Sequence, residues 1–345
     1  MLGSDHSATA FTLADSRFFI GVVALLNSLR LTGHDYELVV LDCGFTDEQR
    51  ARLNRHATVV TLPSELATRT VLAKPFFREL APVVGVALWL DADVLVTGPL
   101  EPIVETARNG HVCAYPVDRT DLRDRRFSEW TALFGLATDP RTQVYVNAGF
   151  FALGLPRHRT LLDRWWQTCE TIPTRTVFAG DIQNPFWAGD QDALNALLMS
   201  EVPAADLLVL PESEAVFPPA AEDARVLDRA RLYCELDGQA VRLVHYSWVP
   251  KPWEPLAWRR TRRPLSDVYR QLLPRVLFEP DVTLRLTPRE VPPSLRPGLV
   301  GASGRATIAV ARPLRLSAAR LAGLLPARAH GRLLELRDRL EPPDR

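Results

Sequence analysis

The chain has 345 residues, of which 47% are hydrophobic and 24% charged, the composition of a folded globular protein with room for a large core. Its 41 basic and 41 acidic residues leave no net charge, which argues against nucleic acid as a general partner. Its four cysteines form no CxxC pair, which argues against a zinc site or a disulfide framework and favours a reducing cytoplasm.

The first ninety residues predict alternating strands and helices. Strands are expected at 11–14, 37–41, 58–62 and 86–90, and helices at 18–31, 46–55 and 66–80. Thr46 and Gln49 have the spacing of a capping box at the start of the second helix. Short, continuously apolar strands between helices are typical of a mostly parallel sheet covered on both faces, so the expected fold class is α/β, doubly wound.

Further apolar runs lie at 111–117, 144–155 and 242–246, with a helix around 160–169. Proline and arginine dominate from residue 250, and a helical stretch at about 314–340 is broken by Pro326. We therefore expect a catalytic domain at 1–258 and a partly helical, Pro/Arg-rich extension at 259–345. The first ten residues lack the apolar run of a signal peptide, and no uncharged apolar run reaches about 18 residues, so a cytoplasmic protein is expected.

The segments 251–275 and 301–345 are both basic. The first has seven basic and two acidic residues, and the second has nine and four. We favour solvated helix surface for both. The alternative is peripheral contact with an anionic membrane on its cytoplasmic face, or with an anionic acceptor.

Two acids, Asp91 and Asp93, end the predicted strand at 86–90. Open α/β sheets bind ligands beyond the carboxyl ends of their strands, and a carboxylate buried there needs a partner. Hard cations such as Mg²⁺ or Mn²⁺ accept carboxylate oxygens, and substrate phosphates usually complete their coordination. The alternative is a pair of exposed loop acids.

His245 ends another apolar run, and Lys251 follows six residues later. An imidazole as third ligand shifts the expected metal from Mg²⁺ toward Mn²⁺. A lysine offers a diphosphate a compact positive charge. Only two of the 41 basic residues are lysines, Lys74 and Lys251, so this arginine-rich chain keeps lysine where a point charge suits a phosphate.

Over residues 9–253, the segments TLADSRFF, LWLDADVLV, VNAGFF, GDQDALN and HYSWVPKPW, together with Lys74, resemble in order those of the retaining glycosyltransferases of family 8. That family contains glycogenin and bacterial lipopolysaccharide galactosyltransferases. The resemblance implies a GT-A fold and transfer of a hexosyl group from a UDP-sugar, glucose or galactose, with Mn²⁺ (or Mg²⁺) and retention of configuration. The acceptor is unknown: a glycan, a lipid-linked sugar or a small molecule.

The resemblance also implies roles around the metal. Asp91, Asp93 and His245 would coordinate it, and Lys251 would contact the donor diphosphate. Lys74 matches a basic position that contacts the donor sugar or nucleotide, and Asp91 would also face the donor. The family has glycine three residues after the histidine, but here that residue is Trp248.

Other positions match the family's donor site. Ala14, Asp15 and Phe18 fall where the base binds, with Phe18 in place of a tyrosine. Asn147 and Gly149 match the family's N-S-G, with alanine replacing the serine.

Asp190 and Gln191 match the D-Q pair on the reacting face of the sugar. One of them would stabilise the cationic sugar during same-face attack, and the alternative is double displacement through Asp190. From the residues alone, GDQDALN also predicts a helix start with Asp190 as its cap.

Other aromatic and charged residues lie near these segments. Trp165 and Trp166 fit a helical core, whereas Trp187 and Trp253 are better candidates for contacting sugar or nucleotide. Asp118, Arg119, Asp121 and Arg123 form a polar stretch that is either a solvated loop or faces the acceptor.

Two other functions compete with transfer. A catalytically inactive binding or scaffold protein of the same fold is consistent with Trp248 in place of glycine. A sugar-phosphate nucleotidylyltransferase would need a glycine-rich, basic loop after its first strand, which LADSRFFIG does not supply.

Overall fold

The computed structural model describes residues 8–82, 85–217, 223–247, 250–254, 267–292 and 295. Residues 1–291 form one compact unit and residues 292–345 a second, and the architecture below is that of the first. The domain boundary expected after residue 258 and the helical stretch expected at 314–340 lie outside the described residues. Within the described residues, no helix is long and apolar enough to cross a membrane.

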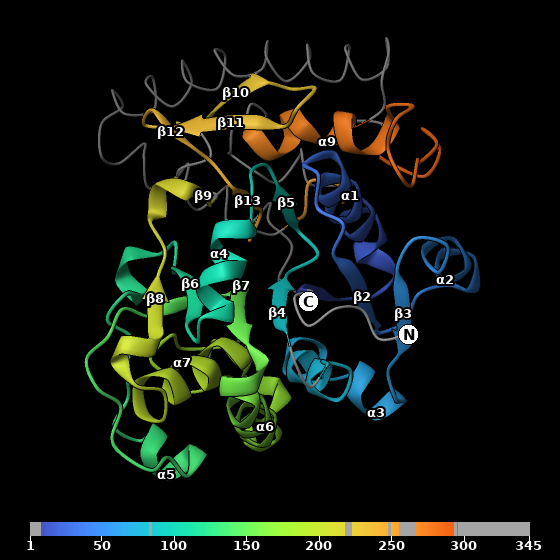
Figure 1. Cartoon of the computed structure of the whole chain (residues 1–345). Helices are drawn as coiled ribbons and strands as arrows, with labels where there is room; N and C mark the ends of the chain where they lie inside the picture. The colour runs from blue at the N-terminus through green and yellow to red at the C-terminus, as the bar shows by residue number, and fades with distance from the viewer. Residues whose placement is uncertain are drawn as a thin grey trace, which may run out of the picture. The chain divides into compact units, whose positions relative to one another are not determined.

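A seven-stranded sheet forms the centre of the first unit. Its strands are β1 (Ala8–Ala14), β2 (Glu37–Asp42), β3 (Thr58–Thr61), β4 (Val86–Leu90), β6 (Val112–Pro116), β7 (Val146–Gly154) and β8 (Leu207–Val209). They lie in the order β3-β2-β1-β4-β7-β6-β8 (Figure 1). β7 runs antiparallel to β4 and β6, while the other neighbours pair in parallel. The sheet is therefore mostly parallel, as the sequence predicts.

Helices pack on the sheet and connect its strands. The α-helices are α1 (Phe19–Leu31), α2 (Asp47–Leu53), α3 (Ser64–Ala67), α4 (Glu101–Arg108), α5 (Trp130–Phe134), α6 (Leu155–Thr171), α7 (Asp190–Ser200) and α9 (Val268–Phe278). Short 3-10 helices are η1 (Ser16–Phe18), η2 (Thr70–Glu79), η3 (Thr120–Leu122), η4 (Thr174–Thr176), η5 (Ala204–Asp206) and η6 (Glu212–Glu214). The capping box at Thr46 is confirmed, because its hydroxyl accepts from Gln49 N while the Gln49 side chain accepts from Thr46 N.

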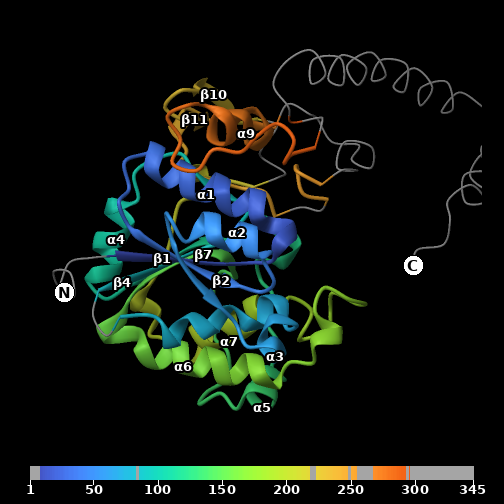
Figure 2. The ribbon, with the colours of Figure 1, turned by 90° about the vertical axis from the view of Figure 1, so that its right-hand side faces the viewer.

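Successive side chains of a strand point to opposite faces of the sheet. Because helices cover both faces, the strands are buried on both. Phe11, Val39 and Trp89 lie in one core cluster with residues of η2, α6 and α7. The neighbouring residues Ala10 and Leu88 are fully buried on the other face, which α1 covers. Figure 2 shows α1 and α6 on opposite sides of the sheet.

The single helix expected at 66–80 is wrong. α3 ends at Ala67, Thr70 has a φ of +51°, and the segment continues as η2 with Pro75 inside it. A proline lacks the N–H that an α-helix interior requires, so the tighter helix replaces it. This local path buries Lys74, which is 4% exposed.

Two smaller sheets complete the unit. The first contains β5 (Val94–Val96), β9 (Ala215–Val216) and β13 (Leu243–His245), and the second is the antiparallel sheet of β10 (Arg225–Asp228), β11 (Tyr233–Leu236) and β12 (Gln239–Ala240). β13 runs antiparallel to β5 and pairs His245 with Val94. This pairing brings His245, which is about 150 residues later in the chain, next to the acids that follow β4.

Candidate active site

Two acids follow the carboxyl end of β4, as expected. The backbone N–H of Asp91 donates to the carbonyl of Gly149 on the neighbouring strand β7 over 2.8 Å. The indole Nε1 of Trp89 donates to Oδ1 of Asp91 over 2.7 Å and fixes that side chain, which is 30% exposed. Asp93 lies deeper, at 7% side-chain exposure. One carboxylate is therefore open to a ligand, and the other is held inside.

His245 completes a group that could hold a metal. Its ring and the carboxylates of Asp91 and Asp93 each offer a ligand atom, and these atoms all lie within 4.8 Å of one another. The buried Nδ1 atom of His245 has no hydrogen-bond partner among the described residues, and Nε2 lies 3.2 Å from Asp93 Oδ1. Two carboxylates and an imidazole suit Mn²⁺ or Mg²⁺, so these residues fit the expected ion.

Gly149 makes room for this histidine. A β-carbon at residue 149 would collide with Cε1 of His245 and would lie 2.9 Å from its Nδ1. Asn147 on the same strand accepts a hydrogen bond from the Gly149 N–H through its side-chain oxygen, over 2.7 Å. Both residues that were expected to bind the donor therefore lie beside the candidate metal site.

Lys251 supplies a buried positive charge next to Asp93. Its ammonium group forms an ion pair with Oδ2 of Asp93 and donates to the carbonyl of Tyr246 over 2.9 Å. Burial works to raise the pKa of Asp93, but the charges of Lys251 and His245 outweigh it and hold that pKa well below its usual value. Asp93 is thus kept ionised.

Lys74 joins the acid pair to α7. Its Nζ atom lies 2.9 Å from Asp91 Oδ1 and 3.0 Å from Asp190 Oδ2, and donates to the carbonyl of Ala148 over 3.0 Å. Burial alone would lower the pKa of Lys74, but Asp190 and Asp91 raise it. Burial raises the pKa of Asp190 to about 6, against the pull of Lys74 and with repulsion from Asp91 adding to the shift.

Asp190 and Gln191 stand in the first turn of α7 and face strand β7. Gly189, with a φ of +58°, holds the cap position, so the interpretation of Asp190 as the helix cap is wrong. The indole of Trp165 donates to the carbonyl of Asp190 over 2.8 Å, and the amide oxygen of Gln191 accepts from Ala148 N over 3.0 Å. The backbone of Asp190 and the side chain of Gln191 are thus held by hydrogen bonds, and the Asp190 carboxylate by its ion pair with Lys74.

The residues expected to bind the base lie at the end of β1, the neighbour of β4. Ala14 is buried at the end of the strand, and the carboxylate of Asp15 accepts two hydrogen bonds from Arg17, each of 2.9 Å. Lys251 Nζ lies 5.8 Å from the centroid of the Phe18 ring, which connects this segment to the candidate metal site. Trp248 lies outside the described residues.

The four tryptophans that the sequence singles out differ in exposure. Trp165 is fully buried in the core cluster, as expected, and Trp166 packs edge-on against Phe76. Trp253 is 3% exposed, donates to the carbonyl of Arg17 and packs edge-on against Phe18, and its expected contact with sugar or nucleotide stays a prediction. Trp187 is half-buried.

The polar stretch at 118–123 lies partly beside Trp187. Arg119 pairs with Asp121, and its guanidinium carbon lies 5.8 Å from the centroid of the Trp187 ring. Arg123 pairs with Glu212 instead. That this loop faces the acceptor stays a prediction.

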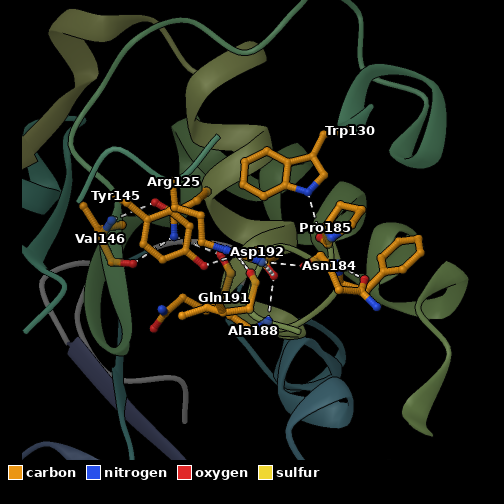
Figure 3. Close-up of polar contacts among 12 residues, drawn as sticks. Arg125, Trp130, Tyr145, Val146, Asn184, Pro185, Ala188, Gln191 and Asp192 are labelled. Atoms are coloured by element: carbon orange, nitrogen blue, oxygen red, sulfur yellow. Dashed lines mark hydrogen bonds and ion pairs between the residues drawn. The ribbon is translucent and has the colours of Figure 1, made fainter. Parts of the chain in front are cut away.

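One buried network next to the site was not predicted. It joins Arg125, Tyr145 and Asp192 next to Gln191 (Figure 3). Asp192 lies in the GDQDALN segment, but Arg125 is one of 39 arginines and 67 residues away, so no spacing in the sequence connects the two.

No family model and no curated protein matches the chain. Solved structures do match, among them the galactosyltransferase LgtC in complex with donor and acceptor sugar analogues, at a TM-score of 0.52 and 16% identity over 79% of this chain and 98% of that chain. An active-site mutant of LgtC matches at 0.54 and 17%, with the same coverage. The bifunctional glycosyltransferase WbbM matches at 0.50 and 15%, over 82% of this chain and 51% of that chain. The likeness shows that the chain has the GT-A fold of these glycosyltransferases.

Proposed function

We propose that this chain is a metal-dependent glycosyltransferase that moves a hexosyl group from a UDP-sugar to an acceptor with retention of configuration. One observation carries the proposal. Asp91, Asp93 and His245 meet at the carboxyl end of β4, and the only two lysines of the chain, Lys74 and Lys251, pair with acids of that same site. Open sheets of this type bind ligands at this edge.

The charges of the site suit a metal and a diphosphate together. The chain has 39 arginines and two lysines, and both lysines lie in this site. A lysine ammonium is a point charge, whereas an arginine guanidinium is a planar fork. A compact cation reaches a single phosphate oxygen without requiring bidentate geometry. Mn²⁺ or Mg²⁺ held by Asp91, Asp93 and His245 would act as a Lewis acid and neutralise charge on the leaving diphosphate.

The residues of the chain have separate tasks in this proposal. Lys251, beside Asp93, would bind the diphosphate and stabilise the negative charge that develops as it leaves. Lys74 keeps the Asp190 carboxylate oriented. The Gln191 side chain is held by Ala148, so that it or Asp190 would face the cationic sugar. The UDP-sugar would be UDP-glucose or UDP-galactose.

The acceptor is proposed only as a class: a glycan, a lipid-linked sugar or a small molecule. The structure of LgtC in complex with donor and acceptor sugar analogues supports a sugar acceptor. Trp187 is half-buried and lies three residues before Asp190. The ring of Phe178, which is 61% exposed, packs edge-on against it, with 5.4 Å between the ring centroids. Exposed aromatic rings of this kind suit contact with the apolar faces of sugars.

Release of UDP from a panel of UDP-sugars tests the proposal. Protein with Mn²⁺ should release UDP from one donor, with a rate that rises when an acceptor is present, and EDTA should abolish it. NMR of the product would then give its anomeric configuration. The same assay on Asp91→Asn is the control. No UDP from any UDP-sugar, with or without acceptor, would sink the proposal.

A further inference from the structure

A buried ion pair lies next to the D-Q pair, because Asp192 directly follows Gln191 in α7. The side chains of Arg125 and Asp192 are 4% and 0% exposed. Arg125 Nε lies 2.6 Å from Asp192 Oδ1, and Nη2 lies 2.9 Å from Oδ2, so the guanidinium binds the carboxylate in a bidentate manner (Figure 3). Such a two-armed contact fixes direction as well as distance.

The same guanidinium holds the loop that leads into α7. Its Nη1 donates to the carbonyl of Ile182, and its Nη2 donates also to the carbonyl of Asn184 over 2.7 Å. From the other side, Trp130 Nε1 donates to the carbonyl of Pro185 over 2.8 Å. Three backbone carbonyls of the loop before α7 are thus hydrogen-bonded to buried side chains.

The Asp192 carboxylate is saturated. Besides Arg125, its Oδ1 accepts from the Tyr145 hydroxyl over 2.7 Å, and its Oδ2 accepts from the N–H of Ala188 over 2.7 Å. Each oxygen therefore accepts two hydrogen bonds, which leaves neither free for substrate. Asp192 can influence the reaction only through the groups that it holds.

Those groups adjoin the D-Q pair. Ala188, held by Asp192, precedes Gly189 and Asp190 directly in the chain. Asn195, one turn after Gln191, accepts from Val146 N and donates to the carbonyls of Val146 and Gln191. Hydrogen bonds of Asp192 and Asn195 therefore connect the loop, strand β7 and the first turn of α7.

We infer that Arg125 and Asp192 are positioning residues that hold the loop 182–188 and, through it, keep Asp190 and Gln191 aimed at the reacting sugar. This inference rests on the proposed function. A buried ion pair is seldom more stabilising than apolar residues of the same size, so its use here fits a need for fixed geometry. Arg125 acts on the reaction only through the loop and α7.

Three arginine variants separate positioning from stability. Arg125→Met removes the fork, and Arg125→Lys keeps the charge but cannot reach the carboxylate and both carbonyls together. The control is Arg164→Met, which breaks the ion pair with Glu201 at the far end of the same helix α7. All are measured well below the unfolding transition of the least stable variant, so that each is almost entirely folded.

We expect Arg125→Met to lower kcat by roughly ten- to a hundred-fold, because small misplacements of reacting groups have effects of this size. The affinity for UDP with Mn²⁺, measured by calorimetry, should stay within about two-fold, because the residues proposed to hold them are untouched. Arg125→Lys should recover part of the lost rate, and Arg164→Met should keep the wild-type rate. Should Arg125→Met fail to fold, Arg125→Lys and Asp192→Asn replace it.

Amide hydrogen exchange gives a readout that needs no activity. Peptides covering 182–191 should exchange faster in Arg125→Met than in wild type, and should be unchanged in Arg164→Met. Unchanged exchange there, or an unchanged kcat in a folded Arg125→Met, would overturn the inference. If wild type neither binds UDP nor turns over, the proposed function fails, and exchange at 182–191 still decides whether Arg125 holds the loop.

Discussion

The ammonium group of Lys74 lies 3.0 Å from the carboxylate of Asp190, and both side chains are buried. The same nitrogen is 2.9 Å from Asp91, so one lysine joins the acid pair after β4 to the first turn of α7. Without it, two carboxylates would face each other in a poorly solvated place. Lys74 is therefore expected to matter for both folding and donor binding.

Replacing Lys74 by methionine should destabilise the fold. Removing one partner of a buried ion pair leaves an uncompensated charge, and we expect a loss of about 3–5 kcal/mol in the free energy of unfolding by urea. Arg157→Met is the control, because Arg157 pairs with Asp206 at the surface and should cost at most about 1 kcal/mol. Equal losses of unfolding free energy in the two variants would contradict the expected cost of leaving a buried charge unpaired.

The pKa of Asp190 predicts a pH-dependent stability in metal-free protein. Its pKa rises from 3.8 to about 6 on folding, mainly through burial. The folded state therefore holds the proton more tightly, and this stabilising contribution is complete below pH 4 and lost as the pH rises through 6. Wild type should lose roughly 2.4 kcal/mol relative to Asp190→Asn between pH 4 and pH 7, out of about 3 kcal/mol for the whole shift.

Urea unfolding of both proteins at pH 4, 5.5 and 7 in EDTA measures that difference. A difference that does not change with pH would contradict the raised pKa. If Asp190 rather than Gln191 faces the cationic sugar, donor turnover with Mn²⁺ should fall when the pH is low enough to protonate its carboxylate.

Gly149 predicts a selective loss of metal binding. In Gly149→Ala the new β-carbon would collide with His245 and turn its ring away from the acids. Gly154→Ala, on the same strand, would collide with the carbonyl of Ala107 instead, far from the acids. Both should lose about 1–3 kcal/mol of stability through overpacking.

Only Gly149→Ala should bind Mn²⁺ at least about ten-fold more weakly, measured by calorimetry, since the lost ligand costs more than about 1.4 kcal/mol. Equal Mn²⁺ affinity in the two variants would remove His245 from the metal site.

Asn27 predicts a purely structural effect. Its buried amide donates to the carbonyls of Val276 and Leu284 over 2.7 and 2.9 Å, and accepts from Leu284 N over 2.9 Å. Asn27→Ala would leave these backbone groups unpaired, so we expect a loss of roughly 3 kcal/mol in the free energy of unfolding. UDP affinity should be unchanged. A loss below about 1 kcal/mol would mean that water replaces the amide.

Most of the main sheet could be predicted because its strands are short, apolar and separated by turn and helix signals. The acids after β4 were found the same way, since carboxylates at the end of a buried apolar strand need a partner. The prediction of one helix at 66–80 failed because α3 ends at Ala67, Thr70 has a positive φ and Pro75 lies inside the segment. Pro75 was the local signal that could have warned against it.

Other parts of the site depend on long-range pairing that sequence does not encode locally. His245 reaches Asp93 because β13 pairs with β5, a three-residue strand with no pattern of its own. The Arg125–Asp192 pair joins residues 67 positions apart, and in an arginine-rich chain neither residue stands out.

Calorimetric titration of UDP into the protein, first with Mn²⁺ and then with EDTA, tests the central claim most directly, because the acid pair and the two lysines should form one site for metal and diphosphate. We expect UDP to bind with Mn²⁺, to bind far more weakly with EDTA, and to lose the metal-dependent part in Asp93→Asn. Failure of UDP to bind the wild type under any metal condition would contradict the account.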